Sequence, residues 1–542
     1  MFSSVSGSKI HFFSASRRKA GLTAVLLLLC IILFCLSVSQ TEDRYDYGSL
    51  RISGEKLQQL TAGRTKSTRP ILREISFDHM PLIYDELGKR WFYTISPEAG
   101  TGDVTVSYSA EKPNAGVAFA GDLIPGSSVR MIAYTDDEYE ISGIEISTIP
   151  FMQIDCESEP TAIWKDPLPI RFTLYDNRTE TRQPIIKSDG TIHVRGNTAQ
   201  FHPKKPYRIA LTTKSIGGIQ KENPTSLLGM RKDGDWILYP AYNDQEKIRN
   251  VFSSNLWFNS CAGNNSFGMN NGMEYRYVEL FMNHRYWGLY AVGYPIDAKQ
   301  MGIMPERNGH YEEFLFKQKA WGPTDRNYYD IGNFLMSVIK MIKPDENYGL
   351  SIMEMYFEDI YTGCRNGMYN YDEINAIDMW LFTKMLQGTD CINHPGQINN
   401  IIYTIKTTNN ERKLIYTPWD MDATWGNESG LVSIAYRMAP TDNSMEMTMN
   451  PVSVLMNKDT GLRLRGKIKE RYFELRKEYW SDQVMDALID GFEQDIYGSG
   501  AYARDAERWP HGGYQDPELG LSLFRTYVHE RLRSLDQYIG DL

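Results

Sequence analysis

The order in which strand-like and helix-like patterns occur along the chain constrains its fold most. Short β-rich runs separated by turn residues fill positions 71–150, for example "GKRWFYTIS" and "SVRMIAYT". Strand patterns continue to about residue 330, interrupted by one helix pattern that begins with Asp244 as its cap, and helical patterns dominate afterwards. Strands followed by helices predict an α+β chain with a smaller β-rich lobe and a larger helical lobe. The runs at 71–150 predict a small β-sandwich-like module ahead of it.

The N-terminus carries a second strong pattern. Residues 21–39, "GLTAVLLLLCIILFCLSVS", contain no charge in 19 positions, with basic residues before them and Glu42 and Asp43 after them. This pattern predicts a signal anchor or a signal peptide that leaves the rest of the chain outside the cytoplasm. We therefore divide the chain into a tail and membrane segment (1–40), a polar linker (41–70), the β-sandwich-like module (71–150) and the main domain (151–542).

Composition narrows the possible partners. The chain has 58 basic and 68 acidic residues and a net charge of −10, which argues against a general nucleic-acid-binding protein, because phosphate backbones need basic surfaces. The six cysteines include no CxxC pair, so zinc-ligand spacing is absent. Their wide spacing leaves both one or two disulfides and unpaired thiols open.

Two acidic residues stand close together in "YTPWDMDATWGN", residues 416–427. A strand pattern ends at Pro418, and Asp420 and Asp422 would share a face if the backbone there were extended. Two neighbouring carboxylates favour a hard divalent cation, with water or phosphate oxygens as the remaining ligands. A turn-forming pair of aspartates is the alternative.

An upstream segment makes the cation more plausible. The helix pattern "DEINAIDMWLFTKMLQG" ends at Gly388, and "TDCINHPGQINNIIYTI" returns as a strand. Asp390 follows the helix directly, and Asn399 stands where the strand begins. Protein kinases use such an order: an Asp that accepts the proton of the substrate hydroxyl, then an Asn and a second Asp that hold Mg²⁺ against nucleotide phosphates.

The β-rich part offers cations for those phosphates. "RGNTAQFHPKKPYRIAL", residues 195–211, contains Arg195, Lys204, Lys205 and Arg208 around a Gly-Asn turn. These side chains are candidates for phosphate contacts, and a basic hairpin edge is the alternative. The P-loop, GxGxxG and HRD motifs are absent from the sequence.

Together these segments resemble the CotH kinase family, named for the spore coat protein H kinase. The resemblance rests on "RGNTAQFHPKKPYRIAL", "LLGMRKDGDWILYPAYNDQEKIRNVFSSNL", "YVELFMNHRYWGLY", "TDCINHPGQINNIIY" and "YTPWDMDATWG", in that order. It implies an atypical, bilobal protein-kinase-like fold, ATP, Mg²⁺ or Mn²⁺, and transfer to Ser or Thr of a partner protein.

The resemblance also implies roles for single residues. Asp390 looks like the catalytic Asp, and Asn399, Asp420 and Asp422 look like the metal ligands. Among the phosphate candidates, Lys205 and Arg208 match best.

Two features depart from the family. Tyr294 stands where the family commonly has Glu, and eight residues separate Asp390 from Asn399, more than is usual. Two readings follow. The first is an exported or membrane-anchored kinase that contacts the membrane through residues 21–39 and phosphorylates a Ser/Thr-rich segment of a surface or coat protein. The second is a catalytically weak scaffold or adhesion protein of the cell envelope. A glycoside hydrolase with Asp420 as its acid would need a second carboxylate at a set separation.

Overall fold

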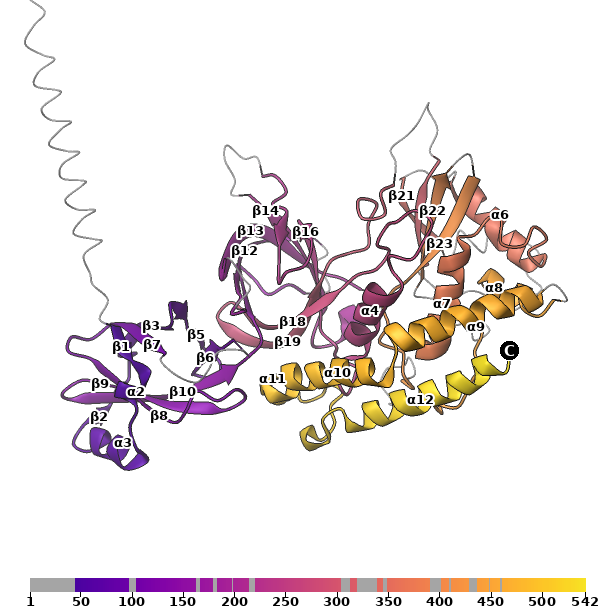
Figure 1. Ribbon diagram of the computed structural model, residues 1–542. Coiled ribbons are helices and arrows are strands. Elements are labelled where there is room, and N and C mark those ends of the chain that lie inside the picture. Colours follow the sequence, from indigo (N-terminus) through magenta and orange to yellow (C-terminus); the bar gives the residue numbers. More distant parts are fainter. Residues whose placement is uncertain are drawn as a thin grey trace, which may run out of the picture. The chain divides into compact units, whose positions relative to one another are not determined.

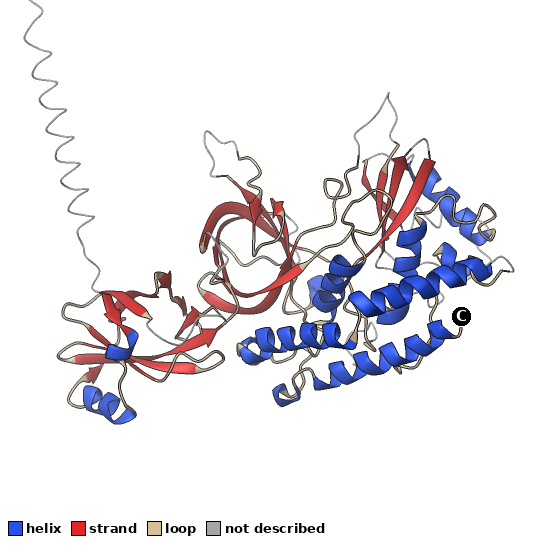
Figure 2. Cartoon of the chain, in the orientation of Figure 1, coloured by secondary structure: helices blue, strands red, loops and turns tan. Residues whose placement is uncertain are grey.

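The structure is a computed structural model that forms two compact units, each containing strands (Figures 1 and 2). Contacts between Cα atoms group Met1–Leu82, Gly102–Gly121 and Arg130–Ile141 into the first unit, and Ile83–Thr101, Asp122–Val129 and Ser142–Leu542 into the second. The structure describes residues 44–96, 104–161, 166–178, 183–196, 198–213, 220–303, 312–318, 339–344, 349–389, 401–408, 411–427, 436–447, 449–458 and 461–542.

The first unit is built around an antiparallel sheet with the strand order β1-β7-β3-β4. A second set of strands faces it, and the rings of Phe77 and Phe119 meet between the two sets with centroids 5.5 Å apart. Two short helices complete the unit. Its elements are β1 (Arg44–Asp46), α2 (Tyr47–Leu50), α3 (Gly54–Thr61), β2 (Thr65–Lys66), β3 (Leu72–Phe77), β4 (Met80–Pro81), β7 (Thr105–Ala110), β8 (Gly116–Ala120) and parts of β9 (Ser128–Tyr134) and β10 (Glu138–Ser147).

The stretch expected to be a linker is folded from residue 44 onward. The Asp46 side chain accepts a hydrogen bond from the backbone of Ser49 and so caps α2, and the Ser53 side chain caps α3. Leu57 of α3 is buried with Ala118 and Ile132. The polar composition of this segment gives no sign of these two helices, because short capped helices need only one or two buried residues to pack against the rest of the unit. The boundary at residue 150 also differs, since residues 83–101, 122–129 and 142–150 belong to the second unit.

A closed barrel forms the first part of the second unit. Its strand order is β11-β12-β13-β14-β17-β19-β18, and parallel pairing of β18 with β11 closes the circle. The β18–β19 hairpin turns at Asn283 and His284, whose φ angles of 50° and 59° are typical of a tight two-residue hairpin turn. The barrel strands are β11 (Phe151–Cys156), β12 (Leu168–Tyr175), β13 (Ile185–Val194), β14 (Tyr207–Thr212), β17 (Asp235–Tyr239), β18 (Tyr275–Met282) and β19 (Arg285–Gly293).

Short elements accompany the barrel. β5 (Ile83–Asp85) and β6 (Arg90–Thr94) pair antiparallel, and β6 runs parallel to the second half of β10. β15 (Thr225–Ser226) pairs with β16 (Lys232–Asp233), and the short helix η1 (Ala199–Phe201) lies between β13 and β14.

The remainder of the second unit combines one antiparallel sheet with helices. The sheet order is β21-β20-β22-β23, from β20 (Phe314–Gln318), β21 (Ile339–Lys343), β22 (Ile401–Thr408) and β23 (Glu411–Pro418). The helices are α4 (Arg249–Ser260), α6 (Gly349–Tyr361), α7 (Glu373–Leu386), α8 (Pro451–Leu455), α9 (Gly461–Glu478), α10 (Asp482–Glu493), η2 (Gln494–Gly498), α11 (Ala501–Arg508), η3 (Pro517–Leu519) and α12 (Ser522–Gly540). The mixed α+β prediction is confirmed, although β22 and β23 come after helices α6 and α7 in the chain.

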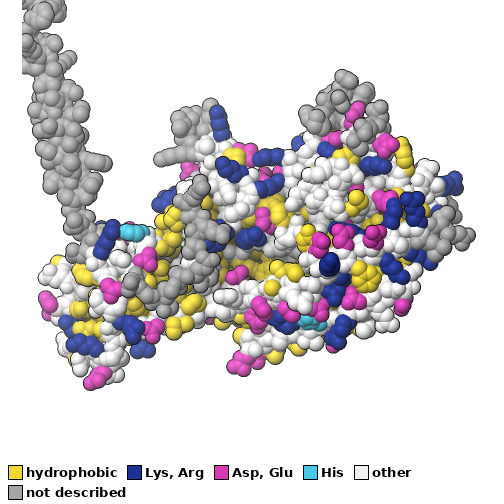
Figure 3. Space-filling model, viewed as in Figure 1, with side chains coloured by type: hydrophobic (Ala, Val, Ile, Leu, Met, Phe, Trp, Pro, Cys, Tyr) yellow, Lys and Arg dark blue, Asp and Glu magenta, His cyan; other side chains and the backbone are white. Residues whose placement is uncertain are grey.

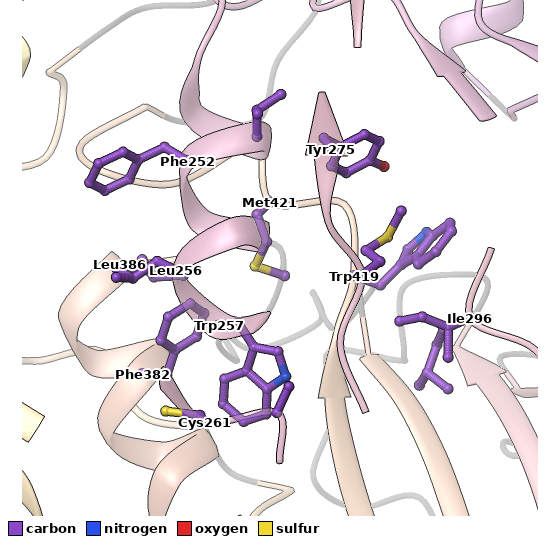
Figure 4. Packing of buried hydrophobic residues seen from close by; sticks show 14 of the residues in the cluster. Phe252, Leu256, Trp257, Cys261, Tyr275, Ile296, Phe382, Leu386, Trp419 and Met421 are labelled. Atoms are coloured by element: carbon purple, nitrogen blue, oxygen red, sulfur yellow. The ribbon is translucent and has the colours of Figure 1, made fainter. Parts of the chain in front are cut away.

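Helix α4 packs against helix α7 at the centre of this unit. Figure 4 shows Leu256 and Trp257 of α4 beside Leu386 and Phe382 of α7, with Phe252 one turn earlier on α4, and the rings of Trp257 and Phe382 lie 5.1 Å apart. All five side chains are almost fully buried and belong to one apolar cluster that extends from the barrel to the C-terminal helices. Their burial holds α4 and α7 in a fixed relation to each other.

The start of α4 differs from the prediction. The helix begins at Arg249 and not next to Asp244, because Lys247 adopts a left-handed φ of 66°. Asp244 still acts on the helix start, since its carboxylate accepts a 2.7 Å hydrogen bond from the backbone N–H of Arg249. The end of α7 agrees with the prediction to one residue: Gln387, with φ 49°, is the left-handed residue that ends it.

A buried ion pair ties the barrel to the C-terminal helices. Lys204 is fully buried, and its ammonium donates to the carbonyls of Pro240 (2.8 Å) and Leu289 (2.5 Å) and to Asp505 (2.9 Å). Asp505 lies on α11, and its other oxygen accepts the backbone N–H of Leu289 at 2.9 Å. Each charge is therefore satisfied inside the protein, which is the condition for burying a charged group at tolerable cost.

The N-terminal segment 21–39 lies outside the described residues. Among the helices that the structure describes, none combines the length and the apolar character needed to cross a membrane. Cys156, Cys261 and Cys364 are free thiols, and Cys391 lies outside the described residues.

Replacing Asp505 should destabilise the second unit strongly. Asp505→Ala leaves the buried Lys204 ammonium without its counter-charge, which costs about 3–5 kcal/mol for a buried pair. Asp235→Ala is the matched control, because the Arg208–Asp235 pair is largely exposed and should contribute less than about 1 kcal/mol. Urea unfolding of the two variants measures both changes, and equal midpoints would contradict the structural role of Asp505.

Candidate functional site

The Asp420–Asp422 loop leaves strand β23 and is held against helix α4. The backbone N–H of Met421 donates to the side-chain oxygen of Asn250 at 2.8 Å, and the indole N–H of Trp425 donates to Ser253 at 3.1 Å. Met421 and Trp425 are buried, whereas Asp420 is exposed and Asp422 half-buried. The loop thus turns its apolar residues inward and keeps both acids toward the surface.

The backbone at Asp420 differs from the expected extended form. Its φ is 57°, in the left-handed region that Asp adopts more readily than most residues. The backbone there is not extended, so the condition under which strand alternation would place Asp420 and Asp422 on one face is not met. The two carboxylates nevertheless act on the same neighbours. Burial raises the pKa of the Tyr275 and Tyr239 hydroxyls, and the charges of both aspartates add to each rise.

The same loop is also joined to both flanks of segment 390–400. The backbone N–H of Thr389 donates to the carbonyl of Ala423 at 3.0 Å, so the end of α7 meets the acidic loop. On the other side, Ile401 at the start of β22 pairs in register with Pro418 at the end of β23. Asp390 and Asn399 themselves lie outside the described residues.

Two cations meet at the aromatic residue beside Asp420. The guanidinium of Arg195 lies 5.5 Å from the centroid of the Trp419 ring, and the ammonium of Lys317 lies 4.4 Å from it. Arg195 follows barrel strand β13, and Lys317 lies on β20, so the barrel and the second sheet both contribute. The ring quadrupole attracts both charges.

The electrostatics of Lys317 link it to the acidic loop. Burial lowers the pKa of Lys317 to about 8. The charge of Asp420 opposes this change, whereas the positive charges of Arg195 and Lys340 add to it. Lys340 is the residue directly opposite Lys317 on the neighbouring strand β21. The charges of Arg195 and Lys340 therefore both reach Lys317 beside Asp420.

The other three predicted cations are engaged elsewhere. Lys204 uses its three ammonium hydrogens inside the protein, as described above, and has none left for a phosphate. Lys205 donates to the carbonyls of Gln200 (3.1 Å) and His202 (2.9 Å) and so braces the β13–β14 loop. Arg208 pairs with Asp235 at 2.9 Å on the barrel surface. Of the four cations predicted from residues 195–211, the structure brings only Arg195 to Trp419.

Two further residues of this site are not among the predicted ones. Lys317 stands in "FLFKQ", where a lysine inside an apolar strand is itself unusual and signals a specific partner. Asn250 lies in the first turn of α4 and is almost fully buried, although nothing in its local sequence separates it from an ordinary helix residue.

Tyr294 occupies the position where the resemblance leads one to expect Glu. Its side chain is buried, meets the Trp236 ring edge-on with centroids 6.4 Å apart, and carries the guanidinium of Arg231 over its ring at 4.2 Å. Tyr294 thus completes the barrel core.

The acidic loop suits a hard cation in its chemistry. Asp420 and Asp422 supply carboxylate oxygens, and Mg²⁺ typically takes one or two carboxylates together with water and phosphate oxygens. Within the part of the chain that the structure describes, no group of three or more His, Cys, Asp or Glu residues gathers into a metal site. A cation held by the loop therefore needs further ligands, for which Asn399 and a nucleotide phosphate are the candidates.

The fold and the site define a mixed α+β protein. Its candidate site combines the acidic loop, joined to the end of α7, with the two cationic side chains Arg195 and Lys317. Residues 192–311 match the family model described as CotH kinase protein, which confirms the resemblance over this segment. The segment covers β14, β17, α4 and the β18–β19 hairpin, and it includes Arg195. No curated protein matches the chain.

Proposed function

We propose that the chain is an atypical protein kinase that transfers the γ-phosphate of ATP to Ser or Thr of a partner protein. One observation carries this proposal: the loop of Asp420 and Asp422 is bonded to both flanks of the segment that contains Asp390 and Asn399. A chain that leaves Thr389 and returns at Ile401 starts and ends beside Asp420. The match of residues 192–311 to the CotH kinase model supports the same class.

The residues take the following roles in this proposal. Asp390 accepts the proton of the substrate hydroxyl while the hydroxyl oxygen forms a bond to the γ-phosphorus. The bond from the γ-phosphorus to the bridging oxygen breaks, and ADP leaves with that electron pair. Asp420, Asp422 and Asn399 hold Mg²⁺ or Mn²⁺, which neutralises charge on the phosphates when it is bound.

The place of action and the partner are part of the same proposal. Residues 21–39 would anchor the chain in a membrane or direct its export, with the kinase part outside the cytoplasm. The substrate would be a Ser/Thr-rich segment of a surface or coat protein.

A second candidate is a kinase-like scaffold or adhesion protein with weak catalysis. Tyr294 favours it, because the buried ring fills the position where the family commonly has Glu. If that Glu contacts nucleotide in the family, this chain lacks the contact. Nucleotide binding and phosphate transfer separate the two candidates.

Removing the proposed base should abolish transfer. The purified full chain should incorporate label from γ-labelled ATP with Mg²⁺ or Mn²⁺ into itself or into a Ser/Thr-rich test peptide. Asp390→Ala should lower this rate by about 10²–10⁴-fold, which is the usual contribution of a general base. Asp516→Ala, an exposed acid far along the chain, serves as the control with unchanged rate. Equal labelling by the Asp390 variant would reject its assignment, and absence of labelling by the wild type would favour the scaffold.

Metal-dependent nucleotide binding should depend on Asp420. ATP with Mn²⁺ should raise the thermal midpoint of the wild type, because a ligand that binds only the native state stabilises it, whereas ATP with EDTA should raise it far less. Asp420→Asn removes one charged metal ligand and should abolish the difference made by Mn²⁺. Each shift is measured against the ligand-free midpoint of the same variant, so a change in the stability of Asp420→Asn is separated from a loss of binding. A Mn²⁺-dependent shift of unchanged size in Asp420→Asn would contradict the metal site.

A further inference from the structure

We infer that Lys317 and Arg195 form a pair that grips the polyphosphate tail of the nucleotide, in place of the cations expected from residues 195–211. The inference rests on the proposed function and assigns the phosphate contacts of that same site. It makes the number of phosphates, and not the base, the main determinant of nucleotide affinity.

The position of Lys317 in the sheet supports this inference. Lys317 lies on β20, where its neighbours Phe316 and Gln318 are buried and the half-buried lysine stands out. Lys317 pairs in register with Ile402 on β22, the strand that follows segment 390–400. Its ammonium reaches the ring of Trp419, the residue before Asp420. One side chain thus adjoins both halves of the proposed active site.

The positive charges around Lys317 also favour a bound polyanion. The positive charges of Arg195 and Lys340 both act on Lys317 beside Asp420, and a divalent cation on Asp420 and Asp422 would make the locality still more positive. Among the described residues, neither the Lys317 ammonium nor the Arg195 guanidinium makes a hydrogen bond or an ion pair with a carboxylate; their contacts are with the Trp419 ring. Partly burying like charges close together is unfavourable. A bound polyanion offsets this, because its negative charge interacts favourably with both cations.

The hydrogen-bond donors of Arg195 and Lys317 are complementary to phosphate oxygens. Arg offers a planar fork that matches two phosphate oxygens, and Lys offers a compact point charge with three donors. Trp419 holds both through its ring face, and since the ring has no acidic group, it leaves their hydrogens available for an anion. Two cations brought together from the barrel and from the second sheet suit a ligand with several phosphates, which can contact both at once.

Ligand affinities of the full chain test this inference. Isothermal titration with Mn²⁺ present should give an affinity order of ATP above ADP above AMP, with inorganic triphosphate also binding. Lys317→Met should raise the Kd for ATP and for triphosphate by roughly ten- to a hundred-fold, the value of one hydrogen bond to a charged group, and should change the Kd for AMP little. Lys317→Arg should restore most of the ATP affinity. Lys187→Met, an exposed lysine on barrel strand β13, is the matched control with unchanged affinity.

The outcomes separate this inference from the function on which it rests. Failure of the wild type to bind ATP would overturn both the kinase proposal and the phosphate grip. ATP binding by the wild type with an equal Kd in Lys317→Met would overturn the grip alone, and so would an equal loss of affinity for ATP and AMP. If Lys317→Met does not fold, Arg195→Met provides the same comparison from the barrel side of the Trp419 ring.

Discussion

The hydrogen bonds that hold loop 419–427 between helices α4 and α7 are the constraint on which the candidate site depends. Asn250 accepts the backbone N–H of Met421, and the carbonyl of Leu386 accepts the backbone N–H of Trp425 at 2.7 Å. Both acceptors lie on helices that a shared apolar core fixes in place. The loop is therefore a rigid platform, and an exposed Asp420 on such a platform can be placed accurately without being buried itself.

The charged side chains around loop 419–427 are arranged differently from the ion pairs elsewhere in the second unit. Buried pairs elsewhere in the second unit are matched, as with Lys204 and Asp505, or Arg504 and Glu279 at 2.6 Å. The C-terminal helices show the same balance at the surface, where Figure 3 shows acidic and basic side chains interspersed and Arg525 pairs with Asp486 at 2.7 Å. Around Trp419, by contrast, cations gather from separate sheets. A cluster of cations drawn from separate elements points to a binding site more strongly than net charge does.

Sequence patterns predicted the local features well. The helix that ends next to Gly388 and the strand that ends at Pro418 both follow from short-range rules of helix termination and periodicity. The segment predicted to be a linker contains α2 and α3, which its polar composition did not reveal because short capped helices are polar on most of their surface.

Long-range pairings explain most of what sequence could not predict. Lys204 and Asp505 are 301 residues apart in the chain, and Lys317 meets Trp419 only because β20 and β23 flank β22 in one sheet. A cluster of cations in one segment suggested one shared ligand, but Lys204 lies in the loop before β14 and is fully buried, whereas Arg208 on that strand pairs with Asp235 at the surface. The left-handed backbone at Asp420 was also not predicted, because the residues around such a position follow no characteristic sequence pattern.

A crystal structure of the full chain with Mn²⁺ and a non-hydrolysable ATP analogue tests the central claim most directly. The account predicts an anomalous manganese peak about 2.1 Å from an oxygen of Asp420. It also predicts that a phosphate oxygen completes the coordination and that the Lys317 ammonium lies within hydrogen-bonding distance of the same phosphate tail. Nucleotide and manganese bound away from loop 419–427, with the Asp420 carboxylate turned to solvent, would contradict the account.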